Sequence, residues 1–169
     1  LRALRFAARL SFRIDGETAA AIHAARIRLR AVAPERLHKE LSGILCGRQA
    51  AALLEEFSDV LFELIPELAP CQGFRQYNPH HTRDVWTHTL AVVDGVPPEE
   101  PLRLAALLHD AGKPATFFFD KNLVGHFYGH PAAGAAVTEE VLRRLRYDRA
   151  TTEFVTQLVA VHGRPIPDD

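Results

Sequence analysis

Apolar positions recur with the period of an α-helix along most of the chain. In residues 34–45, Leu37, Leu41, Ile44 and Leu45 lie three or four residues apart and so share one helical face. Further helices are predicted over residues 1–10, 17–29, 49–57, 58–68, 82–93, 101–111, 131–146 and 151–161. A strand-like run is predicted only at 117–119. The pattern therefore predicts an all-α protein.

A break in this pattern predicts two parts. Residues 70–81 are rich in Pro, Gly, Asn and Gln, which punctuate helices. We expect a helical segment over 1–70 and a second helical set over 71–169. The longest irregular stretch in the second part, 112–130, contains three consecutive phenylalanines and a His- and Gly-rich cluster. Long loops inside compact helical domains are usually functional.

Composition limits the classes of function. A chain of 169 residues can bury a real core, and its net charge of −1 excludes electrostatic nucleic-acid binding by the chain as a whole. Residues 1–48 nevertheless contain ten Lys and Arg side chains against four Asp and Glu. Such an excess suits a phosphate backbone, although an ordinary solvated helical surface explains it equally well.

Other features bear on compartment and completeness. Cys46 and Cys71 lack C-x-x-C spacing, which predicts reduced thiols in a cytoplasmic protein. The sequence has no run of ~20 apolar residues, so no membrane partner is expected. It contains no Met and opens inside a helical pattern, which predicts a piece of a longer protein.

Histidines carry the candidate chemistry, because seven of the nine fall between residues 80 and 162. A single helical histidine is more often an ordinary polar residue than a ligand, so the joint pattern matters. Four predicted helices each contribute metal-ligand candidates near an end or an interior turn, as helical bundles do. These candidates are His88, His109, Asp110, His130 and His162.

This mixture of imidazole and carboxylate suits a divalent transition ion such as Mn, Fe, Ni, Co or Zn, while Mg usually prefers oxygen alone. A bound ion lowers the pKa of its water to about 7, which predicts metal-dependent hydrolysis. Asp110 and Lys113 are the predicted catalytic residues, with Lys113 as a point charge for phosphate.

The remaining histidines receive other roles. His80 and His81 precede a predicted helix and suit a cap, a support for the ligands or a substrate rim. His126 lies four residues before His130 across a glycine, so we expect it to contact substrate or support the ligands. His23 and His38 are predicted to be surface positions on helices.

The order of His88, His109-Asp110, His130 and His162 resembles the HD superfamily of metal-dependent phosphohydrolases. The resemblance implies divalent metal binding, and the extra histidines are similar to those of members that bind two ions. The last family aspartate usually comes later, so either Asp168, Asp169 or a residue beyond the chain would supply it, or this ligand is absent.

Residues 2–14 and 34–41 resemble the neck of bacterial CCA-adding tRNA nucleotidyltransferases and poly(A) polymerases. This resemblance implies neck and body helices over 1–70, an HD domain over 71–169, and tRNA as a partner. It implies that Glu35, Arg36 and Glu40 stabilise the neck, with Arg36 near nucleotide or RNA phosphate. It also places the nucleotide-adding head before Leu1. The RNA-binding candidates are Arg2, Arg5 and Arg9.

Three functions follow from these resemblances. The first is part of a tRNA nucleotidyltransferase whose HD domain hydrolyses a phosphoester or nucleotide, such as a 2′,3′-cyclic phosphate, a 2′-nucleotide or another phosphomonoester. The second is a tRNA-binding module with a catalytically silent HD scaffold, although His88, His109 and Asp110 are all retained. The third, a stand-alone HD nucleotidase, leaves the neck-like first half unexplained.

Overall fold

The computed structural model describes residues 1–77 and 83–163, and the regular secondary structure of these residues is almost entirely helical. The first half comprises α1 (Arg2–Leu10), α2 (Gly16–Ala25), η1 (Arg26–Ala31), α3 (Pro34–Leu45), α4 (Ala50–Glu56), α5 (Ser58–Leu64) and η2 (Pro66–Cys71). The second comprises α6 (Val85–Gly95), α7 (Glu100–Leu108), α8 (Lys113–Thr116), β1 (Phe118–Phe119), β2 (Gly125–His126), α9 (His130–Arg144) and α10 (Arg149–Val161). The all-α prediction is confirmed.

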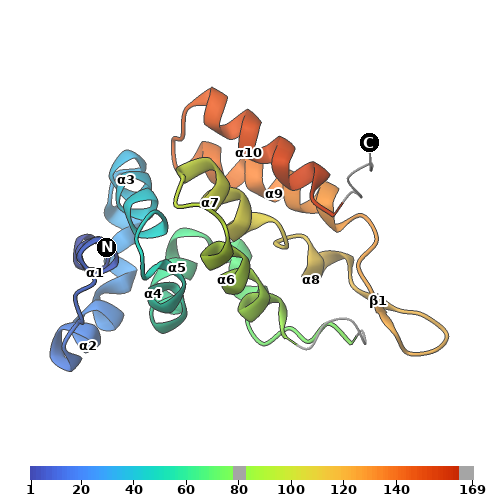
Figure 1. The fold of residues 1–169 in the computed structure, drawn as a ribbon, viewed down its shortest axis with the longest axis horizontal. Coiled ribbons are helices and arrows are strands. Elements are labelled where there is room, and N and C mark those ends of the chain that lie inside the picture. Colours follow the sequence, from blue (N-terminus) through green and yellow to red (C-terminus); the bar gives the residue numbers. More distant parts are fainter. Residues whose placement is uncertain (78–82, 164–169) are drawn as a thin grey trace.

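The helices form a continuous block from which one hairpin projects (Figure 1). Helices α1 to α3 lie at one end, α6 and α7 in the middle, and α9 and α10 pair beside them (Figure 1). The antiparallel pair β1–β2 extends from the opposite end, with Phe118 opposite His126. This arrangement brings the ends of α6, α7, α9 and α10 together.

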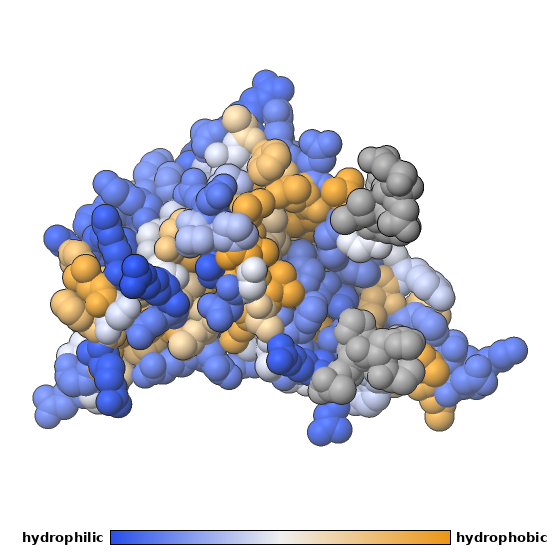
Figure 2. Space-filling model, in the orientation of Figure 1, coloured by the Kyte–Doolittle hydropathy of each residue, from blue (hydrophilic) through white to orange (hydrophobic). Residues whose placement is uncertain are grey.

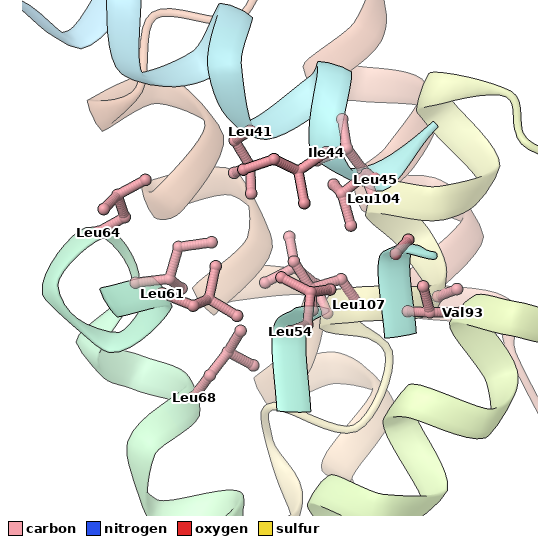
Figure 3. Packing of buried hydrophobic residues seen from close by; sticks show 14 of the residues in the cluster. Leu41, Ile44, Leu45, Leu54, Leu61, Leu64, Leu68, Val93, Leu104 and Leu107 are labelled. Carbon is pink, nitrogen blue, oxygen red and sulfur yellow. The ribbon is translucent and has the colours of Figure 1, made fainter. Parts of the chain in front are cut away.

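A shared apolar core joins the two halves. Leu41 and Leu45 of α3 and Leu104 and Leu107 of α7 are all at most 1% exposed, and they belong to one continuous core (Figure 3). Burying a leucine side chain contributes about 1.5–3 kcal/mol. The predicted boundary near residue 70 therefore falls between helices that stabilise one another.

Aspartate caps explain where three helices begin. Asp15, Asp84 and Asp148 accept hydrogen bonds from the backbone N–H three residues later, at 3.0, 2.8 and 2.9 Å. Such caps satisfy N–H groups that have no partner within the helix. The Asp84 cap matters most for function, because it begins α6 one turn before His88.

The structure differs from the sequence prediction at several elements, among them the short helix α8, which lies inside the stretch 112–130 that was expected to be irregular. The predicted helix 17–29 ends at Ala25 and continues as the 3₁₀ helix η1. The helix predicted over 58–68 ends at Leu64, after which Pro66 begins η2. The strand at 125–126 was not predicted, because two residues are too few to show an alternating pattern.

Polar side chains cover much of the face in Figure 2, with apolar side chains gathered in a band across its centre. Over residues 1–77 and 83–163, no helix has the length and apolarity needed to cross a membrane. Both cysteines are free, and burial raises the pKa of the Cys71 thiol to about 12.

Candidate metal centre

The five predicted metal ligands meet where four helices end or begin. Asp110 lies at the centre, with its carboxylate 2% exposed. Its Oδ1 lies 3.6 Å from Nε2 of both His130 and His162. Its Oδ2 lies 3.1 Å from Nε2 of His109 and 3.7 Å from that of His88. The ligands thus form two groups of three that share Asp110.

Packing of α7 fixes the position of this aspartate. Leu107 and Leu108, which immediately precede His109, are fully buried and hold the last turn of α7 against the core. The chain then turns tightly, with Lys113 N–H donating to the Asp110 carbonyl at 3.0 Å. The carboxylate is therefore presented by a rigid element, as a preorganised site requires.

Backbone hydrogen bonds set the orientation of three imidazoles. Nδ1 of His109, His130 and His162 lies 2.8, 2.7 and 2.6 Å from a backbone carbonyl of the preceding turn. A carbonyl can only accept, so Nδ1 carries the hydrogen and the neutral ring directs the Nε2 lone pair toward Asp110. Metal-binding histidines are held in the same way by a hydrogen bond from the other ring nitrogen.

This orientation brings electron-rich atoms face to face. Nε2 of His130 and Nε2 of His162 are 3.2 Å apart. Two lone pairs at that distance repel unless a proton or a metal ion lies between them. The same holds for His109 Nε2 and the Asp110 carboxylate.

Asp110 itself fits a metal ligand. Its Oδ2 is buried and accepts no well-aligned hydrogen bond from any described residue. Burial would raise the pKa of this carboxyl, but the protons that His109 and His162 donate to it when their rings are charged, together with the Lys113 ammonium, outweigh burial and hold the pKa well below its usual range. The carboxyl is therefore ionised at neutral pH. An ionised carboxylate among imidazoles fits a divalent transition ion.

The pKa values of two histidines move in opposite directions. Burial lowers the pKa of His130, whereas the hydrogen bond to Asp110 raises that of His162. Metal binding requires both rings to be neutral. A proton on His162 therefore competes directly with a metal ion for the same lone pair.

Lys113 lies inside the site and faces Asp110. Its Nζ is 2.9 Å from Asp110 Oδ2 and donates to Gln76 Oε1 at 2.8 Å. The side chain of Lys113 is only 7% exposed, and its ammonium lies 5.3 Å from the centre of the Phe127 ring. Sequence reasoning missed Gln76, because a lone glutamine in a polar segment gives no signal.

Other predicted site residues lie elsewhere. His126 is on the hairpin, where its Nε2 is 3.1 Å from Asp120 Oδ2, and it is in neither ligand group. The predictions on His80, His81, Asp168 and Asp169 concern positions outside the described residues.

His23 and His38 lie on α2 and α3 and are partly exposed, but each ring has partners that the sequence analysis did not predict. His23 Nδ1 lies 2.8 Å from Asp59 Oδ1, and its ring stacks on Phe57. The ring of His38 stacks on Tyr147, with the two centres 4.6 Å apart. Their partners come from distant parts of the chain, so the local pattern could not reveal them.

The predicted RNA-binding arginines differ in their surroundings. Arg2 and Arg9 are exposed on α1, and Arg36 is exposed on α3. Arg5 instead donates to Glu40 at 2.7 Å and ties α1 to α3. Arg5 therefore has a structural role within the chain, in keeping with the neck-stabilising role predicted for Glu40.

An apolar groove of about 330 Å³ borders the ligand cluster. It runs between α6, α7 and α10, and its lining includes Val92, Ala106 and Val159 together with His109 and His162. An apolar part of a substrate could lie here beside the ligands.

The close approach of α9 to the turn that follows α7 offers a test of how the site is held. A Cβ added at Gly112 would lie 2.5 Å from the Gly134 nitrogen and the His130 carbonyl oxygen. We expect Gly112→Ala to destabilise the chain by about 1–3 kcal/mol, because neither backbone atom can yield without moving His130. The matched control Gly95→Ala, which meets nothing within 4 Å, should change stability by less than about 1 kcal/mol. Thermal unfolding of both variants measures the difference, and equal stabilities would contradict the packing argument.

Comparison with known proteins agrees with this geometry. Residues 80–169 match the family model of the HD domain, and the chain belongs to the HD domain family. Residues 11–71 match the model described as the probable RNA- and SrmB-binding site of polymerase A.

More particular similarity is to tRNA nucleotidyltransferases, which confirms the resemblance drawn from the sequence. The chain is 38% identical to a CC-adding tRNA nucleotidyltransferase of Thermus thermophilus, over 100% of the chain and 42% of the relative. It is 34% identical to an A-adding tRNA nucleotidyltransferase of Deinococcus radiodurans, over 99% of the chain and 42% of the relative. A multifunctional CCA protein of Ralstonia nicotianae is 33% identical over 96% of the chain and 39% of its own length. The chain thus spans about two fifths of each of these relatives.

Proposed function

We propose that this chain is the neck, body and HD portion of a tRNA nucleotidyltransferase, with neck and body over 1–70 and the HD domain over 71–169. We further propose that its HD centre hydrolyses phosphoesters with divalent metal ions. The observation that carries the hydrolase proposal is the pair of Nε2 lone pairs on His130 and His162, 3.2 Å apart beside a buried carboxylate. Only a cation or a proton makes that arrangement favourable.

Two ions would fit the donor groups: His88 and His109 would hold one, His130 and His162 would hold the other, and Asp110 would contribute to both. When bound, such ions supply a hydroxide from water at neutral pH and polarise a phosphoryl oxygen. The shared Asp110 carboxylate would keep the two groups of ligands in a fixed position relative to each other. The backbone carbonyls behind His109, His130 and His162 keep each ring in the tautomer that donates its Nε2 lone pair.

Lys113 is the predicted phosphate-binding residue, and its contacts add a second role. Since the ammonium lies between Asp110 and Gln76, we propose that Lys113 positions the bridging carboxylate. Its positive charge also lowers the cost of bringing a phosphate dianion next to Asp110. The substrate would be a 2′,3′-cyclic phosphate, a 2′-nucleotide or another phosphomonoester. We assign His126 and His81 to its rim and Arg36 to nucleotide or RNA phosphate.

The hydrolase proposal is tested with the unaltered 169-residue chain. Mn²⁺-loaded protein should hydrolyse bis(p-nitrophenyl) phosphate, and a chelator should abolish the activity. As the pH is lowered, metal analysis should find a number of bound ions per chain that begins to fall above the ordinary imidazole pKa of about 6.5, because the hydrogen bond to Asp110 raises the pKa of the ligand His162. Metal-free protein that remains equally active would refute the proposal.

The second candidate, a tRNA-binding module, is favoured by the polymerase A match over 11–71 and by the exposed arginines of α1. Binding of tRNA through α1 is compatible with a hydrolytic HD centre, because α1 lies at the end of the molecule away from α9 and α10 (Figure 1), whereas a hydrolytic centre and a silent one exclude each other. The match over 11–71 argues against a stand-alone nucleotidase. A silent scaffold would bind tRNA without any effect of a chelator and without hydrolysis.

Salt dependence of tRNA binding tests the role of α1. The double variant Arg2→Gln/Arg9→Gln should weaken tRNA binding and reduce the slope of log affinity against log salt by about two, because each phosphate contact contributes about one. Arg149→Gln is the matched control, since Arg149 is 89% exposed but lies at the start of α10. Fluorescence anisotropy of labelled tRNA gives both slopes. Equal slopes in the two variants would exclude α1 from the interface.

A further inference from the structure

The hairpin beside the metal centre has two aromatic faces. Phe117 and Phe119 contact Tyr77 on one face, with ring centres 6.0 and 5.2 Å away. Phe118, His126 and Tyr128 lie on the other face, since side chains alternate along a strand. The first face packs against residues 74–77, which also accept a hydrogen bond from the Gly125 N–H at the Tyr77 carbonyl.

The second face presents stacked rings to solvent. His126 stacks on Phe118 with ring centres 5.5 Å apart and on Tyr128 with centres 5.2 Å apart, at angles of 29° and 27°. Tyr128 remains 74% exposed and Phe118 42% exposed. We call these three residues the aromatic platform. Apolar side chains are visible on this projecting hairpin at the edge of the molecule (Figure 2).

The platform is held in place before anything binds. Asp120 accepts hydrogen bonds from the Asn122 and Val124 N–H groups at 2.8 and 2.9 Å, which fixes the turn. Its other carboxylate oxygen lies 3.1 Å from His126 Nε2 and so orients the central ring. A rigid aromatic surface loses little conformational entropy when a flat ligand stacks on it.

The platform also lies next to the ligand cluster. Tyr128 is only two residues before His130, so their Cα atoms are at most about 7.2 Å apart. Phe127, between the platform and the site, contacts the His130 ring and lies near the Lys113 ammonium. Arg75 and Lys121 are both exposed, Arg75 in the segment 74–77 that packs against the hairpin and Lys121 in the turn of the hairpin. Aromatic rings beside cations are how proteins bind single-stranded nucleic acid without strict sequence preference.

We propose that the aromatic platform stacks the terminal base of a single-stranded RNA whose phosphate reaches the metal centre. This inference rests on the proposed phosphoester chemistry, and it assigns the base to the Tyr128 ring and the phosphate to the neighbouring ligands. Stacking accepts any base, because every base has a π-face. The preferred substrate is therefore a phosphoester that carries a base, and its sequence matters little.

The test measures base stacking separately from hydrolysis. A short single-stranded RNA with 2-aminopurine at its 3′ end is titrated with the chain in the presence of a chelator. The fluorescence should be quenched on binding, and Tyr128→Leu should raise Kd at least about fivefold, because it keeps apolar area but loses the π-face. Tyr128→Phe should restore the affinity. Phe154→Leu, a change at an exposed aromatic of α10, is the matched control and should leave Kd unchanged.

Three outcomes would overturn the inference. One is an equal Kd for Tyr128→Leu and the unaltered chain, and another is equal binding of the same RNA with an abasic 3′ residue. The third is self-association of the chain that Tyr128→Leu disrupts while RNA binding is unaffected, which would make the platform a contact between protein copies. Because chelator is present throughout, loss of hydrolysis in the separate Mn²⁺ assay would refute the proposed hydrolase without affecting this result.

Discussion

Asp110→Asn is expected to reduce metal-dependent phosphodiester hydrolysis by more than about a hundredfold, since even a residue that only supports a metal ligand contributes 10–100-fold. The carboxylate is the one group shared by both sets of ligands in the described structure. An amide brings no negative charge and offers a single oxygen, so it cannot bridge two ions. Steady-state hydrolysis of bis(p-nitrophenyl) phosphate and the metal content of the purified protein both measure the loss.

Two further variants make this result interpretable. Asp94→Asn changes an exposed carboxylate on α6 and should leave activity and metal content unchanged. Asp110→Asn also leaves the Lys113 ammonium without a negative partner, so it could unfold the chain. His162→Gln avoids that problem, because it removes a ligand at the half-exposed end of α10. If a folded His162→Gln variant kept full activity and full metal content, His162 would not be a ligand.

Lys113→Met is expected to destabilise the metal-free chain by about 3–5 kcal/mol, because removing one partner leaves the other charge buried and uncompensated. Asp110 is 2% exposed, and no solvent can replace the lost ammonium. Gln76 also loses the donor at 2.8 Å. Chemical denaturation of the metal-free variant measures the change in the free energy of unfolding.

Metal binding should reverse part of this loss. A divalent ion supplies the positive charge that Asp110 lacks in the variant, so saturating Mn²⁺ should stabilise Lys113→Met more than it stabilises the unaltered chain. Lys39→Met is the matched control, because Lys39 is exposed on α3. If Lys113→Met lowered the free energy of unfolding by less than about 1 kcal/mol, which is typical of a surface ion pair, the ammonium would not stabilise the buried Asp110 carboxylate.

The sequence was enough to predict most of the helices and the convergence of the five candidate ligands. Leu37, Leu41, Ile44 and Leu45 repeat with a helical period, and the chain buries that face as predicted. The His109-Asp110 pair follows a buried apolar turn, so its place at the end of α7 could be inferred. The convergence of the five side chains is likewise what the pattern of helix ends predicts.

Contacts between distant residues could not be predicted in the same way. Gln76 reaches Lys113 across 37 positions, and Arg5 reaches Glu40 across 35. Neither glutamine nor arginine shows its partner in the local pattern, because each partner is chosen by tertiary packing. The aromatic platform also depends on the cross-strand pairing of Phe118 with His126. Strands of two residues are too short for the sequence to predict this pairing.

Anomalous scattering from crystals of the chain grown with Mn²⁺ tests the central claim most directly. The account predicts two anomalous peaks on either side of the Asp110 carboxylate, one bonded to His88 and His109 and the other to His130 and His162. It also predicts that both peaks disappear in Asp110→Asn. Crystals saturated with Mn²⁺ that show no peak within bonding distance of Asp110 would contradict it.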